Sequence, residues 1–417
     1  MAMIITSRIS NDCYQDQGLP TLQSPWWQHL PTDFHRQPDQ FDTNRLTRTL
    51  VNATAAIDAG VRTGLAGMVS AAALPGLLNS NQMREERAQF DFYCRFADAS
   101  SPHEFFREPE KVSRVHRQKA APWHFRPEDG KVKALHFESP FTPVNPALRD
   151  RYLSHSRNRT AWAQHWQHRD GPRPTIIVVH GFVADPYWIN TRFLSLPWFY
   201  KQGYDVLLYT MPFHGKRQDR LSPFSGSGFF RYGLSHVNEA FAHTIHDLRI
   251  FMRYLRDLGV EEIGATGISL GGYTSAMLSC VEDSLNFVIP NVPVVSLIDL
   301  MLGWFPLNVE VTGAMRRQGL DITDLRHVTA MHSALNWPSL VPPEKRLIIG
   351  GAGDRFVPPK QIWLLWQHWQ QCALHWFPGN HLIHLDQGRY LKDMRRFLES
   401  VSSLTPGVHR PEPAALS

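Results

Sequence analysis

Residues 263–274 read Ile-Gly-Ala-Thr-Gly-Ile-Ser-Leu-Gly-Gly-Tyr-Thr and place Ser269 between Gly267 and Gly271, directly after a short apolar run. A hydroxyl that attacks a substrate has to project from a tight strand-to-helix turn, where side chains at two neighbouring positions would clash. The same residues also fit a plain Gly/Ser turn at the start of a helix. We predict a nucleophile elbow at Ser269, because the partners that such a serine needs follow downstream.

Two of those partners each follow an apolar run. Asp354 comes after the run at 347–349 and its glycines, and His381 ends the sequence Phe-Pro-Gly-Asn-His after the run at 374–377. In an open α/β sheet the active crevice lies at the carboxyl ends of the strands. Taken singly, each residue fits a turn or a loop. The order serine, aspartate, histidine predicts Ser269 as nucleophile, His381 as base and Asp354 as the group that orients the base.

Each of these two roles has a competing residue. His384 is the other candidate base, but a helix that begins in this loop would place it one turn deeper than His381, so we favour His381. Asp299, just beyond the preceding strand, is the other candidate carboxylate.

The oxyanion of an acyl-transfer reaction needs two backbone N–H donors aimed at one point. Leu270, directly after the nucleophile, is expected to supply one. The second should come from the loop that begins at His180-Gly181, most directly from Phe182, with Val183 as the alternative.

These motifs together resemble the α/β-hydrolase superfamily over roughly residues 120–400. The motifs are His180-Gly181, Pro-Phe-His-Gly-Lys-Arg at 212–217, Gly-Ile-Ser-Leu-Gly at 267–271, Gly353-Asp354 and Gly379-Asn-His381. More narrowly, Asp-Pro-Tyr-Trp at 185–188, residues 212–217 and Thr-Gly-Ile-Ser-Leu-Gly-Gly at 266–272 are similar to the α/β-hydrolase-domain-containing 18 family, a lipid-associated branch. The chain has a shorter cap than the eukaryotic members. The resemblance implies a serine hydrolase that works through an acyl-enzyme.

The periodicity of the chain predicts an α/β fold, with a mostly parallel central sheet, helices on both faces, a small helical cap and a helical N-terminal extension. Two period-two segments are expected as half-buried strands, at 132–137 and 160–167. Continuous apolar runs are expected as central strands, at 175–179, 205–209, 287–295, 347–349 and 374–377, and three- to four-residue spacing predicts a helix over 237–258.

We divide the chain into an arm and helical extension (1–110), a catalytic domain (111–402) with a cap insertion at about 296–338, and a disordered tail (403–417). Residues 1–50 are expected to form an irregular arm docked by Trp26 and Trp27. Polar joints are expected at 79–87 and 97–103.

Charge and cysteine usage exclude several classes of function. The net charge is +5, but Lys and Arg are scattered, which does not suit a nucleic-acid-binding protein. The 21 His and four Cys show no metal-ligand spacing, so we expect no metal and no cofactor. The Cys positions suggest a reducing compartment.

The segment Thr63–Leu78 is uncharged and apolar, yet shorter than the about 20 residues that cross a bilayer, and Pro75 interrupts it. It could span a membrane, lie at its interface or pack on the catalytic domain, and we favour packing. Because residues 1–20 lack the pattern of a secretory signal, we expect a cytoplasmic protein, with peripheral membrane contact as a further possibility.

The expected activity is hydrolysis of a carboxylic ester with an apolar acyl or lipid-like group, because the cap carries Leu302, Trp304, Phe305 and Leu307. An acyltransferase, an oligopeptidase-type peptidase and a non-catalytic binding module are the alternatives. The candidate substrate contacts are His180, His214, Trp304 and Phe305, although His214 also fits a loop-holding role. Lys216 and Arg217 could meet an anionic headgroup, but we favour solvated surface charge. The oligomeric state is left open.

Overall fold

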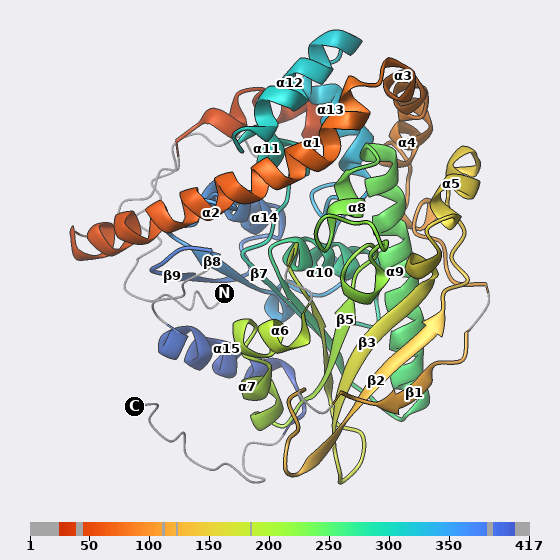
Figure 1. Cartoon of the computed structure of the whole chain (residues 1–417). Coiled ribbons are helices and arrows are strands. Elements are labelled where there is room, and N and C mark those ends of the chain that lie inside the picture. The colour runs from red at the N-terminus through yellow and green to blue at the C-terminus, as the bar shows by residue number, and fades with distance from the viewer. Residues whose placement is uncertain are drawn as a thin grey trace.

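The computed structural model describes residues 25–38, 45–110, 113–121, 124–183, 186–381 and 387–404. Within these ranges nine strands form one sheet at the centre of the molecule (Figure 1). The strands are β1 (His116–Lys119), β2 (Gly130–Glu138), β3 (Thr160–His168), β4 (Thr175–Val179), β5 (Asp205–Thr210), β6 (Ile263–Ile268), β7 (Phe287–Asn291), β8 (Leu347–Gly351) and β9 (Ala373–Phe377). Their spatial order is β1-β2-β3-β5-β4-β6-β7-β8-β9.

Strands β4 to β9 run parallel to one another, whereas β1, β2 and β3 are joined to the sheet by antiparallel pairing. The mostly parallel sheet predicted from the sequence is therefore confirmed. The strand predicted over 287–295 ends early, at Asn291. Val292 turns the backbone with a φ of 40°, and Pro293 has no N–H for a ladder hydrogen bond.

Helices cover both faces of the sheet, as predicted. In β4, Ile177 and Val179 point into one core, and Ile176 and Val178 point into the other. This alternation explains why the central strands are continuous apolar runs. The first core also contains α9 (Leu234–Asp257), α10 (Leu270–Val281) and α14 (Pro359–His368). The second contains residues next to α6 (Tyr187–Phe193), and residues of α7 (Leu196–Lys201) and α15 (Gln387–Val401).

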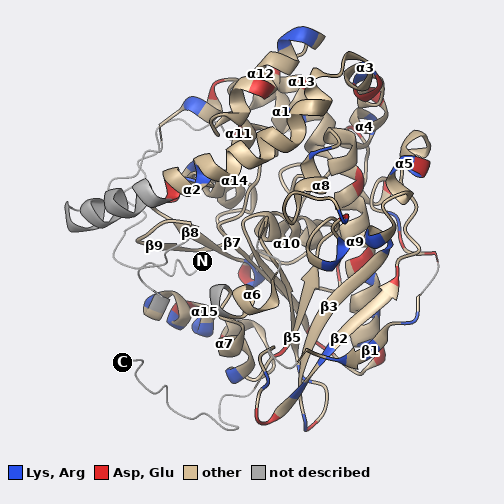
Figure 2. Cartoon of the chain, in the orientation of Figure 1, with Lys and Arg blue, Asp and Glu red and all other residues tan. Residues whose placement is uncertain are grey.

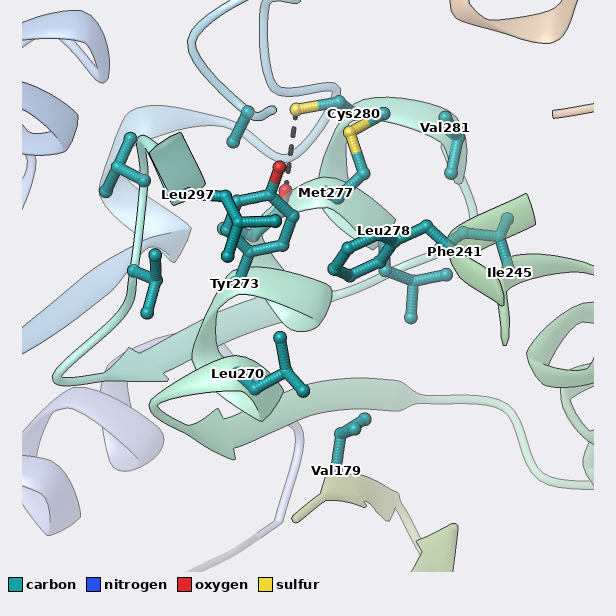
Figure 3. Packing of buried hydrophobic residues seen from close by; sticks show 14 of the residues in the cluster. Val179, Phe241, Ile245, Leu270, Tyr273, Met277, Leu278, Cys280, Val281 and Leu297 are labelled. Atoms are coloured by element: carbon teal, nitrogen blue, oxygen red, sulfur yellow. Dashed lines mark hydrogen bonds between the residues drawn. The ribbon is translucent and has the colours of Figure 1, made fainter. Parts of the chain in front are cut away.

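Helix α10 is buried along its whole length. Phe241 and Ile245 of α9 pack on the side of Met277 and Leu278, and Val179 of β4 lies below Leu270 (Figure 3). The helix that follows Ser269 therefore rests on a close-packed apolar layer, which holds its first turn in place.

A helical layer forms at one end of the sheet from the cap and the N-terminal extension together (Figure 1). The cap consists of α11 (Leu297–Leu302), α12 (Leu307–Gln318) and α13 (Ile322–Ala330), and the extension of α1 (Trp26–His29), α2 (Arg45–Leu78), α3 (Ser80–Ala88) and α4 (Phe90–Ala97). Short helices α5 (Arg149–Leu153) and α8 (Ser227–Phe230) lie nearby. Helix α2 packs on α12, and α13 packs on α1 and α4. The domain division at residue 110 stays a prediction.

Three expectations for the extension have a clear outcome. Trp26 and Trp27 are buried, and Trp27 stacks on His327 at 4.7 Å, so the predicted docking is confirmed. The joint predicted at 79–87 is wrong, because Asn79 caps a helix there by accepting hydrogen bonds from two following backbone amides. Pro75 does not interrupt the apolar segment but lies inside the last turn of α2.

Among the described residues, one helix is long and apolar enough to cross a membrane by length and composition. It is the part of α2 from Asp58 to Leu78, with a mean hydropathy of 1.3 and 17% of its most apolar stretch buried. Arg62 at its start donates a hydrogen bond to the carbonyl of Arg355, so this end of the segment is attached to the rest of the protein. Of the predicted tail, only Ser403 and Leu404 lie within the described residues.

Candidate active site

Ser269 stands in a sharp turn between β6 and α10, with φ 58° and ψ −113°. A Cβ on Gly271 would lie 2.0 Å from the carbonyl oxygen of Val179, and one on Gly267 would lie 2.4 Å from the backbone of Gly271. Side chains at these positions are therefore excluded by backbone atoms that cannot move away. The turn has the geometry of a nucleophile elbow, and Ser269 stays partly exposed in it.

Asp354 follows β8, His381 follows β9, and Ser269 follows β6, so all three lie beyond the carboxyl ends of parallel strands. The His381 Nδ1 atom is 2.7 Å from Asp354 Oδ2. The other oxygen of Asp354 accepts hydrogen bonds of 2.8 Å from the amides of Phe356 and Val357. The carboxylate is thereby fixed in the orientation in which it meets the imidazole.

The environment of His381 acts on its pKa in opposite directions. Burial is the largest single effect and lowers the pKa of the imidazole. The charge and hydrogen bond of Asp354, together with the charge of Asp58, outweigh it, so the net direction is upward from 6.5. The imidazolium is thus favoured by its partners.

The competing base His384 lies outside the described residues. The competing carboxylate Asp299 instead accepts hydrogen bonds from Nε and Nη2 of Arg326, at 2.9 and 2.7 Å.

The loop after β4 lies directly against the serine. A Cβ on Gly181 would be 3.6 Å from the Cβ of Ser269. Within the described residues, the amide of Phe182, next in the chain, donates no hydrogen bond, nor does that of Leu270 at the first position of α10. These two amides are therefore available as donors beside the serine. Val183 follows with a φ of 64° and stays the alternative.

His180 and His214 are fully buried. The Nε2 atom of His180 accepts a hydrogen bond from the Met211 amide at 3.1 Å. The Nδ1 atom of His214 lies 2.8 Å from the carbonyl oxygen of Pro212. Gly226 packs directly against the other side of the ring, where a Cβ on this glycine would lie 2.4 Å from Nε2. This burial does not favour the substrate contacts predicted for the two rings. They instead hold the loops after β4 and β5, which for His214 is the alternative role that the sequence predicts.

Two further predicted substrate contacts lie at the cap. Trp304 donates its indole N–H to the carbonyl of Phe356 at 3.0 Å, and Phe356 stacks on His381 with ring centroids 4.9 Å apart. Phe356 thus contacts both Trp304 and the imidazole of His381. Phe305 is 61% exposed.

The solvated surface position predicted for Arg217 is wrong, because the side chain is completely buried. Its guanidinium pairs with Asp247 at 2.9 Å and donates to the hydroxyl of Tyr209. Burial of a charge is tolerated when an opposite charge and hydrogen bonds satisfy it. Lys216 lies over the ring of Trp162, 4.0 Å from its centroid. Other Lys and Arg positions are scattered along the ribbon over many elements of the fold (Figure 2).

An apolar cavity of about 130 Å³ lies between the extension and the cap. Among its lining residues are Val69, Phe230, Met301 and Val311. Phe230 packs against Phe182, with ring centroids 5.1 Å apart, so one of the rings that line the cavity contacts the loop beside Ser269. Within the described residues, no cluster of His, Cys, Asp and Glu could hold a metal ion.

One residue of this region was not found from the sequence. Asp58 of α2 is completely buried and accepts a hydrogen bond from the amide of His381 at 2.9 Å. No local motif signals this contact, because the two residues are far apart in the chain.

A family model described as alpha/beta hydrolase fold matches residues 174–342. The chain has the α/β-hydrolase fold. This hydrolase-fold chain is 28% identical over 329 residues to an uncharacterised protein of Mycobacterium tuberculosis, a match that covers 76% of the chain and 74% of that relative.

Solved structures with the same fold include two esterases. Acetyl xylan esterase 1 from Thermoanaerobacterium sp. JW/SL YS485 has a TM-score of 0.51 and 17% identity, and the match covers 78% of this chain and 99% of that one. The acetyl xylan esterase from Paenibacillus sp. R4 has a TM-score of 0.50 and 12% identity, with 78% and 100% covered. At these identities the likeness extends to the fold, and the chemistry has to be argued from the site.

Proposed function

We propose that this protein is a serine hydrolase that cleaves a carboxylic ester with an apolar acyl or lipid-like group. The observation that carries the proposal is the hydrogen bond of 2.7 Å between His381 and Asp354, at the sheet edge where the elbow presents Ser269. A structural ion pair elsewhere in the fold would not require a strained serine turn beside it.

In the proposed reaction the Nδ1–H of His381 donates to Asp354, which leaves the lone pair of Nε2 for the hydroxyl of Ser269. The serine oxygen attacks the acyl carbon while His381 takes its proton. The amides of Phe182 and Leu270 hold the oxyanion, and His381 returns the proton to the leaving alcohol. Water then attacks the acyl-enzyme by the same route and releases the acid and the free serine.

The preference for an apolar substrate is supported by the surroundings of the site. The cavity behind Phe230 is lined mainly by aliphatic and aromatic side chains, and Trp304 and Phe305 lie at the cap. Movement of the Phe230 side chain would let an acyl chain reach this space from the loop beside Ser269. An acyltransferase or a peptidase would use the same three residues, and these alternatives differ only in the acceptor or the leaving group.

The test is covalent labelling with a fluorophosphonate probe, followed by hydrolysis of p-nitrophenyl esters of increasing chain length. We expect labelling of the wild-type protein at Ser269, no labelling of Ser269→Ala, and faster hydrolysis as the acyl chain lengthens. A wild-type protein that resists the probe would favour a non-catalytic module. Labelling without ester hydrolysis would favour a peptidase or a transferase.

We also propose that the protein is cytoplasmic and contacts membranes peripherally, through α2 and through the residues around the start of α12. Large apolar side chains are exposed there, namely Val61, Met68, Leu74, Leu78, Phe305 and Val309. In vesicle flotation, the variant Met68→Ser/Leu74→Ser should bind less than wild type, and salt should weaken binding to anionic vesicles. Equal flotation of the variant and wild type would exclude this face.

A further inference from the structure

Asp58 connects the N-terminal extension to both loops that carry the proposed acid and base. Its Oδ2 atom accepts a hydrogen bond from the amide of His381 at 2.9 Å and another from the amide of Arg355 at 3.1 Å. Arg355 directly follows Asp354 in the chain. A single buried oxygen therefore ties the loop after β9 to the loop after β8.

Arg62 makes a second attachment from the same helix. It lies one turn after Asp58, so the two side chains share a face of α2. The Nη1 atom of Arg62 donates to the carbonyl oxygen of Arg355 at 2.8 Å. Helix α2 thus binds both the N–H and the C=O of the residue after Asp354, which fixes the backbone of this loop from both sides.

The charge of Asp58 faces the catalytic pair. The charged groups around it are Asp354, His381 and Arg355 from the two loops and Arg62 from its own helix. Burial and the charge of Asp354 raise the pKa of Asp58 to about 6, against the lowering effect of its two backbone donors. The carboxylate is therefore mostly ionised at pH 7, where it contributes to the raised pKa of His381.

We propose that Asp58 is a positioning residue for the catalytic base, which it holds in register with Asp354 and supports with a second negative charge when the imidazole takes up a proton. This inference rests on the triad of the proposed function. The extension then belongs to the catalytic machinery, because a residue of α2 completes the support of His381.

Two substitutions separate the hydrogen bonds from the charge. Asp58→Ala removes the acceptor of both amides, whereas Asp58→Asn keeps one oxygen for them and removes the charge. The asparagine nitrogen would replace Oδ1, which has no hydrogen-bond partner within the described residues. The matched control is Asp91→Asn, which makes the same change at a side chain of the extension that is 96% exposed.

The first measurement is the rate of fluorophosphonate labelling of Ser269 in the full chain as a function of pH. We expect Asp58→Ala to slow labelling by about 10²-fold, the order of loss that a small misplacement of catalytic groups causes. For Asp58→Asn, the labelling rate on the high-pH plateau should fall less than for Asp58→Ala. The pH at which its labelling rate rises should be lower than for wild type. The reason is that removing a negative charge lowers the pKa of the imidazole, which must be neutral to act as base. Asp91→Asn should match wild type.

Wild-type labelling rates in folded Asp58→Ala would overturn the positioning role, and an unshifted pH profile in Asp58→Asn would overturn the electrostatic role. If Asp58→Ala does not fold, the comparison of Asp58→Asn with wild type still decides the second point. A purely structural residue would lower thermal stability without moving the profile.

A second measurement is independent of any reaction. The imidazole of His381 can be titrated by ¹⁵N NMR of histidine-labelled protein, with its signals identified by their loss in His381→Gln. Asp58→Asn should lower the pKa of His381 relative to wild type and Asp91→Asn, and an unchanged titration would contradict the inference. If the wild-type serine is unreactive, the proposed function fails while this titration still tests Asp58.

Discussion

Asp354→Asn should lower the rate of acylation of Ser269 by about 10⁴-fold, the order observed where a triad aspartate has been replaced in this way. The structure predicts the orientation that the new amide takes. One carboxylate oxygen of Asp354 accepts from the amides of Phe356 and Val357, and the other faces Nδ1 of His381. The asparagine oxygen can occupy only one of these two positions.

The oxygen should stay with the two backbone donors. Turning the amide around would leave two buried N–H groups facing an NH₂ group, at a cost of about 1–3 kcal/mol for each donor. The NH₂ group is therefore directed at Nδ1 of His381, which must then accept rather than donate. The ring proton moves to Nε2, where the imidazole cannot accept the proton of the serine. A 10⁴-fold loss corresponds to about 5.5 kcal/mol in the activation free energy.

The assay compares second-order rate constants of fluorophosphonate labelling for wild type, Asp354→Asn and the exposed control Asp91→Asn. Melting temperatures should show that all three proteins are folded. A loss of less than about tenfold in folded Asp354→Asn, with Asp91→Asn unchanged, would refute the reasoning from tautomers and transfer the orienting role to another carboxylate.

Three other changes probe the site and its surroundings. Ser269→Ala should abolish ester hydrolysis without lowering the melting temperature, and retention of more than a few per cent of activity would exclude this nucleophile. Gly271→Ala should strongly destabilise the fold, as seen by melting temperature, because its Cβ would lie 2.0 Å from the carbonyl oxygen of Val179. Burial raises the pKa of Glu86 from 4.5 to about 7. Between these two values the folded state keeps a proton that the unfolded chain loses, so the free energy of unfolding falls as the pH rises. Glu86→Gln should therefore gain stability over wild type between pH 5 and 8, whereas the exposed control Glu85→Gln should show no such gain.

The parts of the site that were predictable from the sequence are those encoded by local patterns. An apolar run followed by a glycine turn places Ser269, Asp354 and His381 at strand ends, and parallel strands bring their ends to one edge. Burial on both faces likewise explains why the run at 175–179 could be identified as a central strand.

The parts that were missed depend on tertiary contacts. Arg217 looked like a surface charge because its partner Asp247 comes from the following helix α9, and only the folded protein shows that the pair is buried. Asp58 could not be found because side-chain contacts to backbone amides leave no motif. The polar sequence of α3 predicts a joint rather than a helix, because this helix is solvated on most sides and lacks the apolar periodicity by which helices are recognised.

The attachment of α2 to the loops after β8 and β9 has a consequence for the order of events during synthesis. The residues that Asp58 binds are separated from it by 297 and 323 positions, so the helix leaves the ribosome long before its partners exist. Contacts of such long range form late in folding. A chain that is still being made, or one cleaved before residue 381, can hold a folded elbow and yet lack its base. The proposed activity would then begin only when the loop after the last strand is in place, because His381 belongs to that loop.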